Sequence, residues 1–139
     1  MSTYKHILLA ADFSEHGQRV SERAKDLTDR YQARLSIIHV VDNLPITDAT
    51  CGPVIPFDID LTEELMAVEA EKLHIPQDRQ WLELGSPKLE IIRVAEEQDV
   101  DLIVVGSHGR HGLALLLGST ANGVLHHAPC DVMAVRLKT

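Results

Sequence analysis

The sequence lacks any long run of apolar residues. The runs at residues 102–105 and 113–117 are far too short to cross a bilayer, which needs about 20 apolar residues. The first six residues, Met-Ser-Thr-Tyr-Lys-His, also lack the apolar core and the small-residue cleavage site of a secretory signal. We therefore expect a cytoplasmic protein that makes no contact with a membrane.

Cysteine is scarce, and basic residues do not gather into a patch. Cys51 and Cys130 are the only two cysteines, which excludes a disulfide framework and a paired Cys-x-x-Cys metal knuckle. The formal net charge is -8, with 13 Lys and Arg residues scattered among 21 Asp and Glu residues. Because a nucleic-acid surface needs clustered positive charge, we expect no nucleic-acid partner.

What the chain does have is a regular alternation of two patterns. Short apolar runs predict strands, and apolar residues that recur every three or four positions predict amphipathic helices. The predicted strands are 5–11, 33–41, 79–84, 102–105 and 131–137, and the predicted helices start near Ser14, near Asp60 or Thr62, at Ser86 and at Ser119. The residues predicted to face the core are Val20, Ala24, Leu27 and Tyr31 in the first helix, Leu61, Leu65, Val68 and Leu73 in the second, and Leu89, Ile92 and Ala95 in the third.

This alternation predicts the α/β class, with a parallel sheet covered by helices on both faces. With 139 residues, the chain fits one domain spanning residues 1–139. A ligand site in such a sheet lies beyond the carboxyl ends of the strands, where the strand order reverses. Two segments are predicted at those ends, Ala10-Ala11-Asp12 after the first strand and Gly106 to Gly109 after the fourth.

The stretch from Gly106 to Thr120, GSHGRHGLALLLGST, has the composition of a phosphate-binding loop. Glycines let phosphate oxygens approach the main chain, and a helix that starts at Ser119 adds free amides. The motifs G-x-x-x-x-G-K-[ST] and G-x-G-x-x-G are both absent. Because glycines also close tight connections, a purely structural turn remains the alternative on these features alone.

Several ordered segments together resemble the universal stress protein family. They are KHILLAADFSE, IIHVVD, DLIVVGSHGR and GSTANGVLHHAPCDVMAVR, and they extend over nearly the whole chain. The resemblance implies a Rossmann-like, adenine nucleotide alpha hydrolase-like fold with five parallel strands in the order 3-2-1-4-5. It also implies a homodimer and, in one branch of the family, ATP binding through G-x2-G-x9-G-[ST].

The resemblance also implies which residues would bind the nucleotide. Asp12 would face the ribose or a Mg²⁺ ion, and the main chain at Val40 would meet adenine. Gly106, Gly109, Gly118 and Ser119 would surround the phosphates. The candidate nucleotide-binding residues are Ala10, Ala11, Asp12, Val40, Gly106, Ser107, His108, Gly109, Arg110, Gly118, Ser119 and Thr120.

The glycine loop differs from the family motif in its length. Eight residues separate Gly109 from Gly118, so the spacing is G-x2-G-x8-G-S and one residue is missing. Gly112 lies in this segment and favours a loop that absorbs the deletion. The function expected is a stress-response homodimer that binds ATP or another adenine nucleotide. The alternative is a nucleotide-free stress protein, like the A-type branch of the family, that acts as a partner-binding dimer.

Several single residues also allow other chemistries. Asp12 can cap the following helix as well as serve the site. His108, His111, His126, His127 and Cys130 invite a zinc site, but no pair among them has a zinc-finger spacing. Ser119 and Thr120 could accept a phosphoryl group. The loop has no lysine and the chain has no G-x-S-x-G motif, so we expect no enzyme beyond slow ATP hydrolysis or autophosphorylation.

Two further features concern rival folds and partners. A phosphoacceptor receiver domain needs an acidic pair after the first strand, whereas Asp12 has no acidic neighbour. The last strand would be an exposed sheet edge, and such edges are normally covered. We therefore expect homodimer pairing along it through Val132, Ala134 and Arg136, with Leu137 continuing the interleaved pattern.

Overall fold

The computed structural model describes residues 4–13, 17–42, 59–107 and 118–136. It contains one sheet of five parallel strands in the order β3-β2-β1-β4-β5, as the resemblance implied. The strands are β1 (His6–Ala10), β2 (Arg34–Asp42), β3 (Gln80–Gly85), β4 (Leu102–Gly106) and β5 (Asp131–Val135). The helices are α1 (Gly17–Tyr31), α2 (Ile59–Leu73), α3 (Pro87–Glu97) and α4 (Ser119–His127), with a 3-10 turn η1 at Gln77–Arg79.

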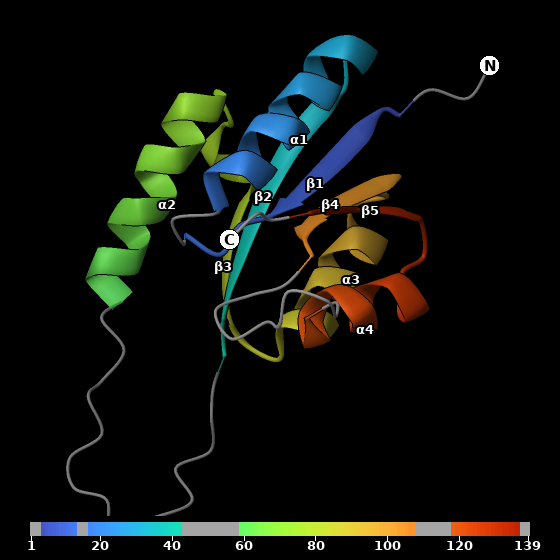
Figure 1. Ribbon diagram of the computed structural model, residues 1–139. Coiled ribbons are helices and arrows are strands. Elements are labelled where there is room, and N and C mark those ends of the chain that lie inside the picture. Colours follow the sequence, from blue (N-terminus) through green and yellow to red (C-terminus); the bar gives the residue numbers. More distant parts are fainter. Residues whose placement is uncertain (1–3, 14–16, 43–58, 108–117, 137–139) are drawn as a thin grey trace, which may run out of the picture.

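The helices cover both faces of the sheet, and a core cluster lies on each face. Figure 1 shows α1 and α2 on one side of the strands and α3 and α4 on the other. Successive strand residues point to opposite faces, so Ile7 and Leu9 pack in the cluster below α1 and α2. Leu8 packs in the cluster below α3 and α4. The nearly continuous apolar strands follow from this two-sided burial. Among the described helices, none is long and apolar enough to span a membrane.

The predicted core face of α2 is wrong at three of its four residues, and Leu73 is buried as predicted. Leu61, Leu65 and Val68 are 52%, 40% and 52% exposed. The residues that α2 buries are Thr62, Met66, Ala70 and Leu73. Apolar residues lie on two sides of this helix, and the hydrophobic period cannot say which side meets the sheet. The side with Ala70 packs in the core, and the small side chain lets the helix approach closely.

Two smaller predictions about helix faces also fail. Tyr31 is 39% exposed because it lies in the last turn of α1, where its ring meets Tyr4 edge-on with 5.1 Å between the ring centroids. Leu89 in the first turn of α3 is 60% exposed. The residues that α3 buries are Ile91, Val94 and Ala95, of which Ala95 was predicted. Ser86 does occupy the N-cap position of α3, but its side chain makes no capping hydrogen bond.

Three helices end in the same way, with a left-handed residue that is not glycine. The φ angles of Gln32, His74 and Asp99 are 53°, 58° and 53°. At the end of α2 the Ile75 amide donates to Ala70 at 2.9 Å, and the His74 amide donates to Glu71 at 3.2 Å. This is the Schellman pattern, in which glycine is the usual left-handed residue. Each of these three helices therefore ends sharply, at a residue whose left-handed backbone conformation is strained.

The amino end of β1 is held by a buried polar group. His6 is 3% exposed, and its Nδ1 lies 3.1 Å from the carbonyl oxygen of Gln98. A carbonyl can only accept, so Nδ1 carries the proton and Nε2 accepts from the Ser36 hydroxyl. Burial lowers the pKa of His6 below its usual value, with the carbonyl of Gln98 opposing this shift. The imidazole is therefore held neutral inside the fold.

Candidate functional site

Those predicted site residues that the structure describes lie where β1 ends earlier than its two neighbours, β2 and β4. The register of β1 with β2 ends at Ala10 and Ile38, and its register with β4 ends at Leu9 and Val104. Both neighbours continue, β2 to Asp42 and β4 to Gly106. Because the strand order reverses between β1 and β4, this notch is the crevice in which ligands of open α/β sheets bind.

The main chains of two predicted site residues face this notch. Alternate residues of a strand present their N–H and C=O groups to the same neighbouring strand. The carbonyl of Ile38 accepts from the Ala11 amide at 2.9 Å, so Val40 presents its main chain to the same side. On the other flank, the Ser107 amide donates to Val135 of β5 at 2.8 Å. Gly106, one residue earlier, therefore faces the side of β1.

The two ends of the glycine loop are joined at the mouth of the notch. The Gly118 amide donates to the carbonyl of Ser107 at 2.7 Å. Gly118 is the N-cap of α4, so the first turn of this helix starts directly beside the end of β4. The amides of Ser119 and Thr120 have no acceptor within the helix, because every α-helix leaves its first amides unsatisfied. Ser119 is exposed and Thr120 is half-buried.

The turn that follows β1 is strained. Phe13 has a φ of 58°, a left-handed conformation that costs an ordinary L-residue roughly 1–2 kcal/mol. The Phe13 ring packs on the ring of His39 with 4.4 Å between centroids. Nδ1 of His39 in turn donates to the carbonyl of Ala11 at 2.7 Å. These contacts hold the turn that carries Asp12 in place.

His39 is a site residue that was not predicted. The sequence gives a weak signal for it, a single polar residue inside the apolar strand IIHVVD. If the hydrogen-bonded pairing of β1 with β2 continued past Ala10, the carbonyl of Ala11 would accept from a main-chain amide of β2. The side chain of His39 donates to that carbonyl instead. This contact helps to end the β1–β2 pairing, so His39 shapes the notch.

The predicted nucleotide-binding residues fall into two groups, those that the structure describes and those that lie outside the described part of the chain. One group comes together at one end of the sheet and comprises Ala10, Ala11, Asp12, Val40, Gly106, Ser107, Gly118, Ser119 and Thr120. Ser107 is buried, Ser119 is exposed and the others are partly buried. His108, Gly109 and Arg110 lie outside the described residues. Asp12 lies five residues before Gly17, the first described residue of α1. Ser14, near which the sequence predicts the start of this helix, is outside the described part.

The zinc alternative gains no support from the described residues. No three His, Cys, Asp or Glu side chains among residues 4–13, 17–42, 59–107 and 118–136 are grouped to hold a metal ion. Burial, with further contributions from Asp101 and Asp131, raises the pKa of Cys130 to about 11. Its thiol is thus protonated near neutral pH, whereas a zinc ligand or nucleophile is a thiolate. His108 and His111 lie outside the described residues.

Comparisons with known proteins agree with this architecture. The sequence profile of the Universal stress protein family matches residues 3–136. Universal stress protein A homolog 2 of Coxiella burnetii is 42% identical over an alignment of 147 residue positions, gaps included. The alignment covers 99% of this chain and 99% of the relative. The solved structure of universal stress protein UspA from Lactobacillus plantarum superposes on this chain with a TM-score of 0.70. The two sequences are 27% identical, and the match covers 99% of this chain and 100% of that one.

A third relative has been solved with a ligand. A universal stress protein in complex with cAMP shares the fold, with a TM-score of 0.72 at 20% identity over 97% of this chain and 98% of that one. The strand order, the notch and the matches over almost the full length lead to the same assignment. The chain belongs to the universal stress protein family.

Proposed function

We propose that this protein serves the stress response by binding ATP or another adenine nucleotide in the notch beyond β1. The observation that carries the proposal is the convergence of three kinds of group at one place. The main chains of Val40 and Gly106 face the notch from two sides, the start of α4 lies at its mouth, and Asp12 follows β1. The cAMP complex of a protein with the same fold is consistent with an adenine ligand.

Each part of the notch suits one part of the nucleotide. The N–H and C=O of Val40 would pair with the edge of adenine, which offers both an acceptor and a donor. The carboxylate of Asp12 would accept from ribose hydroxyls or ligate Mg²⁺ together with phosphate oxygens. The free amides and the positive dipole end of α4 would bind the phosphates. Since the net charge is -8, these local groups must overcome repulsion between the protein and the ligand.

The experiment is a titration of the purified protein with nucleotides, with and without Mg²⁺. ATP should raise the melting temperature, and ligand linkage gives a gain of about 2.7 kcal/mol at a hundredfold excess over the dissociation constant. GTP should give a smaller shift, because guanine presents a different edge to Val40. Mass spectrometry of released ligand should find an adenine nucleotide. No shift at millimolar ATP and no released nucleotide would refute the proposal.

Asp12→Asn tests the role of the carboxylate against a matched control. Asp78→Asn makes the same change in η1, which precedes β3 and therefore lies at the opposite end of the sheet. ATP binding should weaken roughly tenfold in Asp12→Asn, the loss of about one charge-assisted hydrogen bond. It should remain unchanged in Asp78→Asn. Equal affinities in the two variants would remove Asp12 from the site.

We also propose that the functional unit is a cytoplasmic homodimer formed along β5, the edge strand next to β4. Because Val135 bonds to the β4 side, Val132, Ala134 and Arg136 present their main chains to the open edge. Ala134→Pro removes one amide from that edge without removing a bond to β4. It should convert a dimeric mass in light scattering to a monomeric one, and a monomeric wild-type mass at micromolar concentration would refute the dimer.

The shortened loop, G-x2-G-x8-G-S, favours one second candidate, a nucleotide-free dimer that binds a protein partner. The same titration distinguishes the two candidates, because the second predicts dimerisation without any nucleotide-dependent shift. In either case we propose that the protein acts by binding rather than as a fast enzyme, since the loop has no lysine to stabilise phosphoryl transfer.

A further inference from the structure

The side of α2 that points away from the sheet carries a row of exposed aliphatic residues. Leu61, Leu65 and Val68 are 52%, 40% and 52% exposed. They are spaced four and three residues apart, so they form one stripe about 10 Å long on the helix. The buried stripe of α2, which includes Met66 and Ala70, lies on a different side. The helix is therefore apolar on two sides, and only one of them is used by the core.

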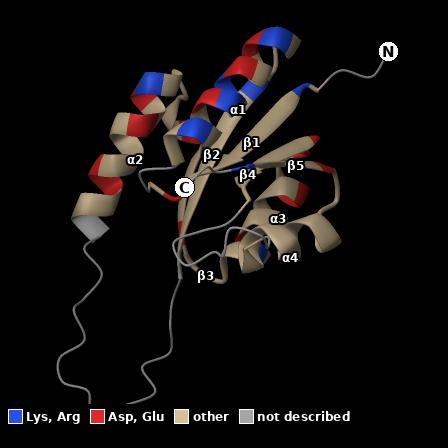
Figure 2. Cartoon of the chain, in the orientation of Figure 1, with Lys and Arg blue, Asp and Glu red and all other residues tan. Residues whose placement is uncertain are grey.

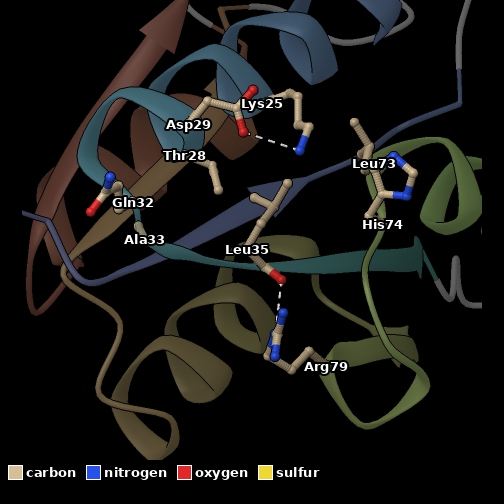
Figure 3. Close-up of a pocket in the computed structure, with 9 residues that line it drawn as sticks. All are labelled: Lys25, Thr28, Asp29, Gln32, Ala33, Leu35, Leu73, His74 and Arg79. Carbon is tan, nitrogen blue, oxygen red and sulfur yellow. Dashed lines mark hydrogen bonds and ion pairs between the residues drawn. The ribbon is translucent and has the colours of Figure 1, made fainter.

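The exposed stripe leads into a groove between α1 and α2. Lys72 is four residues after Val68 and seven after Leu65, which places it on the same side of the helix. Lys72, Glu69 and Leu73 line the α2 wall of the groove, which encloses about 340 Å³. At the carboxyl ends of the two helices the groove meets a hollow of about 380 Å³. Figure 3 shows both Leu35 and Leu73 at this hollow, with Leu35 below the Lys25–Asp29 ion pair and Leu73 to the right of it.

The charges around this surface are mainly acidic. The groove is lined by Glu22, Asp26, Asp29 and Glu69, against Lys25 and Lys72. Lys25 is paired with Asp29 at 3.1 Å, and Arg30 is paired with Asp26 at 3.0 Å. Glu22 and Glu69 form no ion pair with any other residue in the described part of the chain. Figure 2 shows acidic bands along both helices, interleaved with basic bands on α1.

We propose that the stripe and the groove, here called the α1–α2 surface, dock an amphipathic helix of a basic partner protein. Apolar anchors at helical spacing on the partner would cover Leu61, Leu65 and Val68, as in helix-in-groove recognition. Its Lys or Arg residues would meet Glu22 and Glu69. The groove meets the hollow at the amino ends of the strands, which is the end of the sheet opposite the nucleotide notch.

Charge decides against the two other occupants that this surface could have. A second copy of the chain would bring Glu69 and its acidic neighbours against the same acidic residues, which costs association energy. Residues 43–58, which precede α2, contain Asp48 and Asp58 and neither lysine nor arginine. A basic partner is the occupant that the charge of the α1–α2 surface complements.

The test uses a defined probe, a fluorescent Leu/Lys peptide of about 15 residues, or about four helical turns, with its leucines on one face. A scrambled peptide of the same composition removes the apolar face and keeps the charge. In fluorescence anisotropy the amphipathic peptide should bind at least about tenfold more tightly than the scrambled one, the effect of about one well-buried anchor residue. Equal affinities would overturn the proposal, because charge alone would then explain binding.

Two variants locate the binding. The double variant Leu65→Gln, Val68→Gln should lose the preference for the amphipathic peptide. Leu125→Gln makes the same kind of change at a 43% exposed leucine on α4, and it should leave the preference intact. The variant Glu22→Gln, Glu69→Gln should weaken binding and reduce its dependence on salt. Loss of the preference in Leu125→Gln would overturn the proposal.

Measurements on the free variants distinguish the other occupants. Glutamine is a good helix former and the replaced side chains are exposed, so the double variant should keep the wild-type unfolding midpoint and mass. A lower midpoint with unchanged mass would mean that the chain covers its own α2 stripe. A lower mass in light scattering would mean that a second copy covers it. Either result would overturn the docking of a basic partner.

Discussion

The substitution Ser119→Glu separates the stability of the fold from the binding of phosphate. Ser119 is the first residue of α4, and its side chain is exposed. A carboxylate in the first helical turn interacts favourably with the helix dipole and should stabilise the free protein by about 0.3–1 kcal/mol. The same carboxylate would repel a phosphate bound at this turn. The variant should therefore be at least as stable as the wild type and bind ATP more weakly.

The size of the repulsion follows from the distance and the exposure of the site. Two unit charges about 4 Å apart interact with about 1 kcal/mol in water and about 4 kcal/mol at an effective dielectric constant of about 20. Because the side chain of Ser119 is exposed, the effect should lie toward the lower value. We expect ATP affinity to fall by roughly tenfold, which corresponds to about 1.4 kcal/mol.

The assay is calorimetric titration with ATP and with adenosine, and Ser119→Gln is the neutral control of the same size. ATP should bind about tenfold more weakly to Ser119→Glu than to Ser119→Gln. Because the expected effect comes from the charge and not from the size of the side chain, Ser119→Gln and the wild type should bind ATP about equally. Adenosine carries no phosphate and should not distinguish the two variants. Equal ATP affinity in the Glu and Gln variants would show that the phosphates do not lie at the start of α4.

Two further predictions concern stability. His74→Gly should stabilise the protein by about 0.5–1 kcal/mol in urea denaturation, because glycine relieves the strain of the left-handed backbone. The control Glu71→Gly, inside the same helix, should destabilise it by about 1 kcal/mol. If both variants lose stability, His74 is not strained. The pKa of His6 is lower in the folded protein than in the unfolded chain. As the pH falls, the unfolded chain therefore takes up this proton before the folded protein does. The free energy of unfolding should decrease below about pH 6.5 by up to about 1.4 kcal/mol per pH unit. His6→Gln should remove this part of the pH dependence between pH 5 and 7, and identical pH profiles would contradict it.

The order of the elements could be predicted because each one has a local signature. The apolar run 102–105 is too short and too uniformly apolar for an amphipathic helix, and β4 lies at Leu102–Gly106. Ser86-Pro87 predicts a helix start, and α3 begins at Pro87. Gly118-Ser119 marks the start of α4 at the predicted residue. In each case the residues that decide the structure are neighbours in the chain.

The faces of the helices could not be predicted in the same way. The period of α2 is compatible with burial of Leu65 or of Met66, and only contact with the sheet selects Met66. The prediction chose the side with more leucines, which led to an exposed stripe being placed in the core. That error also hid the α1–α2 surface, which exists because α2 turns Leu61, Leu65 and Val68 outward.

The sequence by itself determined the alternation of strands and helices, the glycine-rich loop ends and the family, because these depend on residue types in a fixed order. The tertiary structure decided where β1 stops relative to β2 and β4, and that His39 takes the carbonyl of Ala11. It also decided which side of α2 is buried. These features depend on pairing between segments far apart in the chain, and hydrogen-bond register and close packing are settled only when those segments meet.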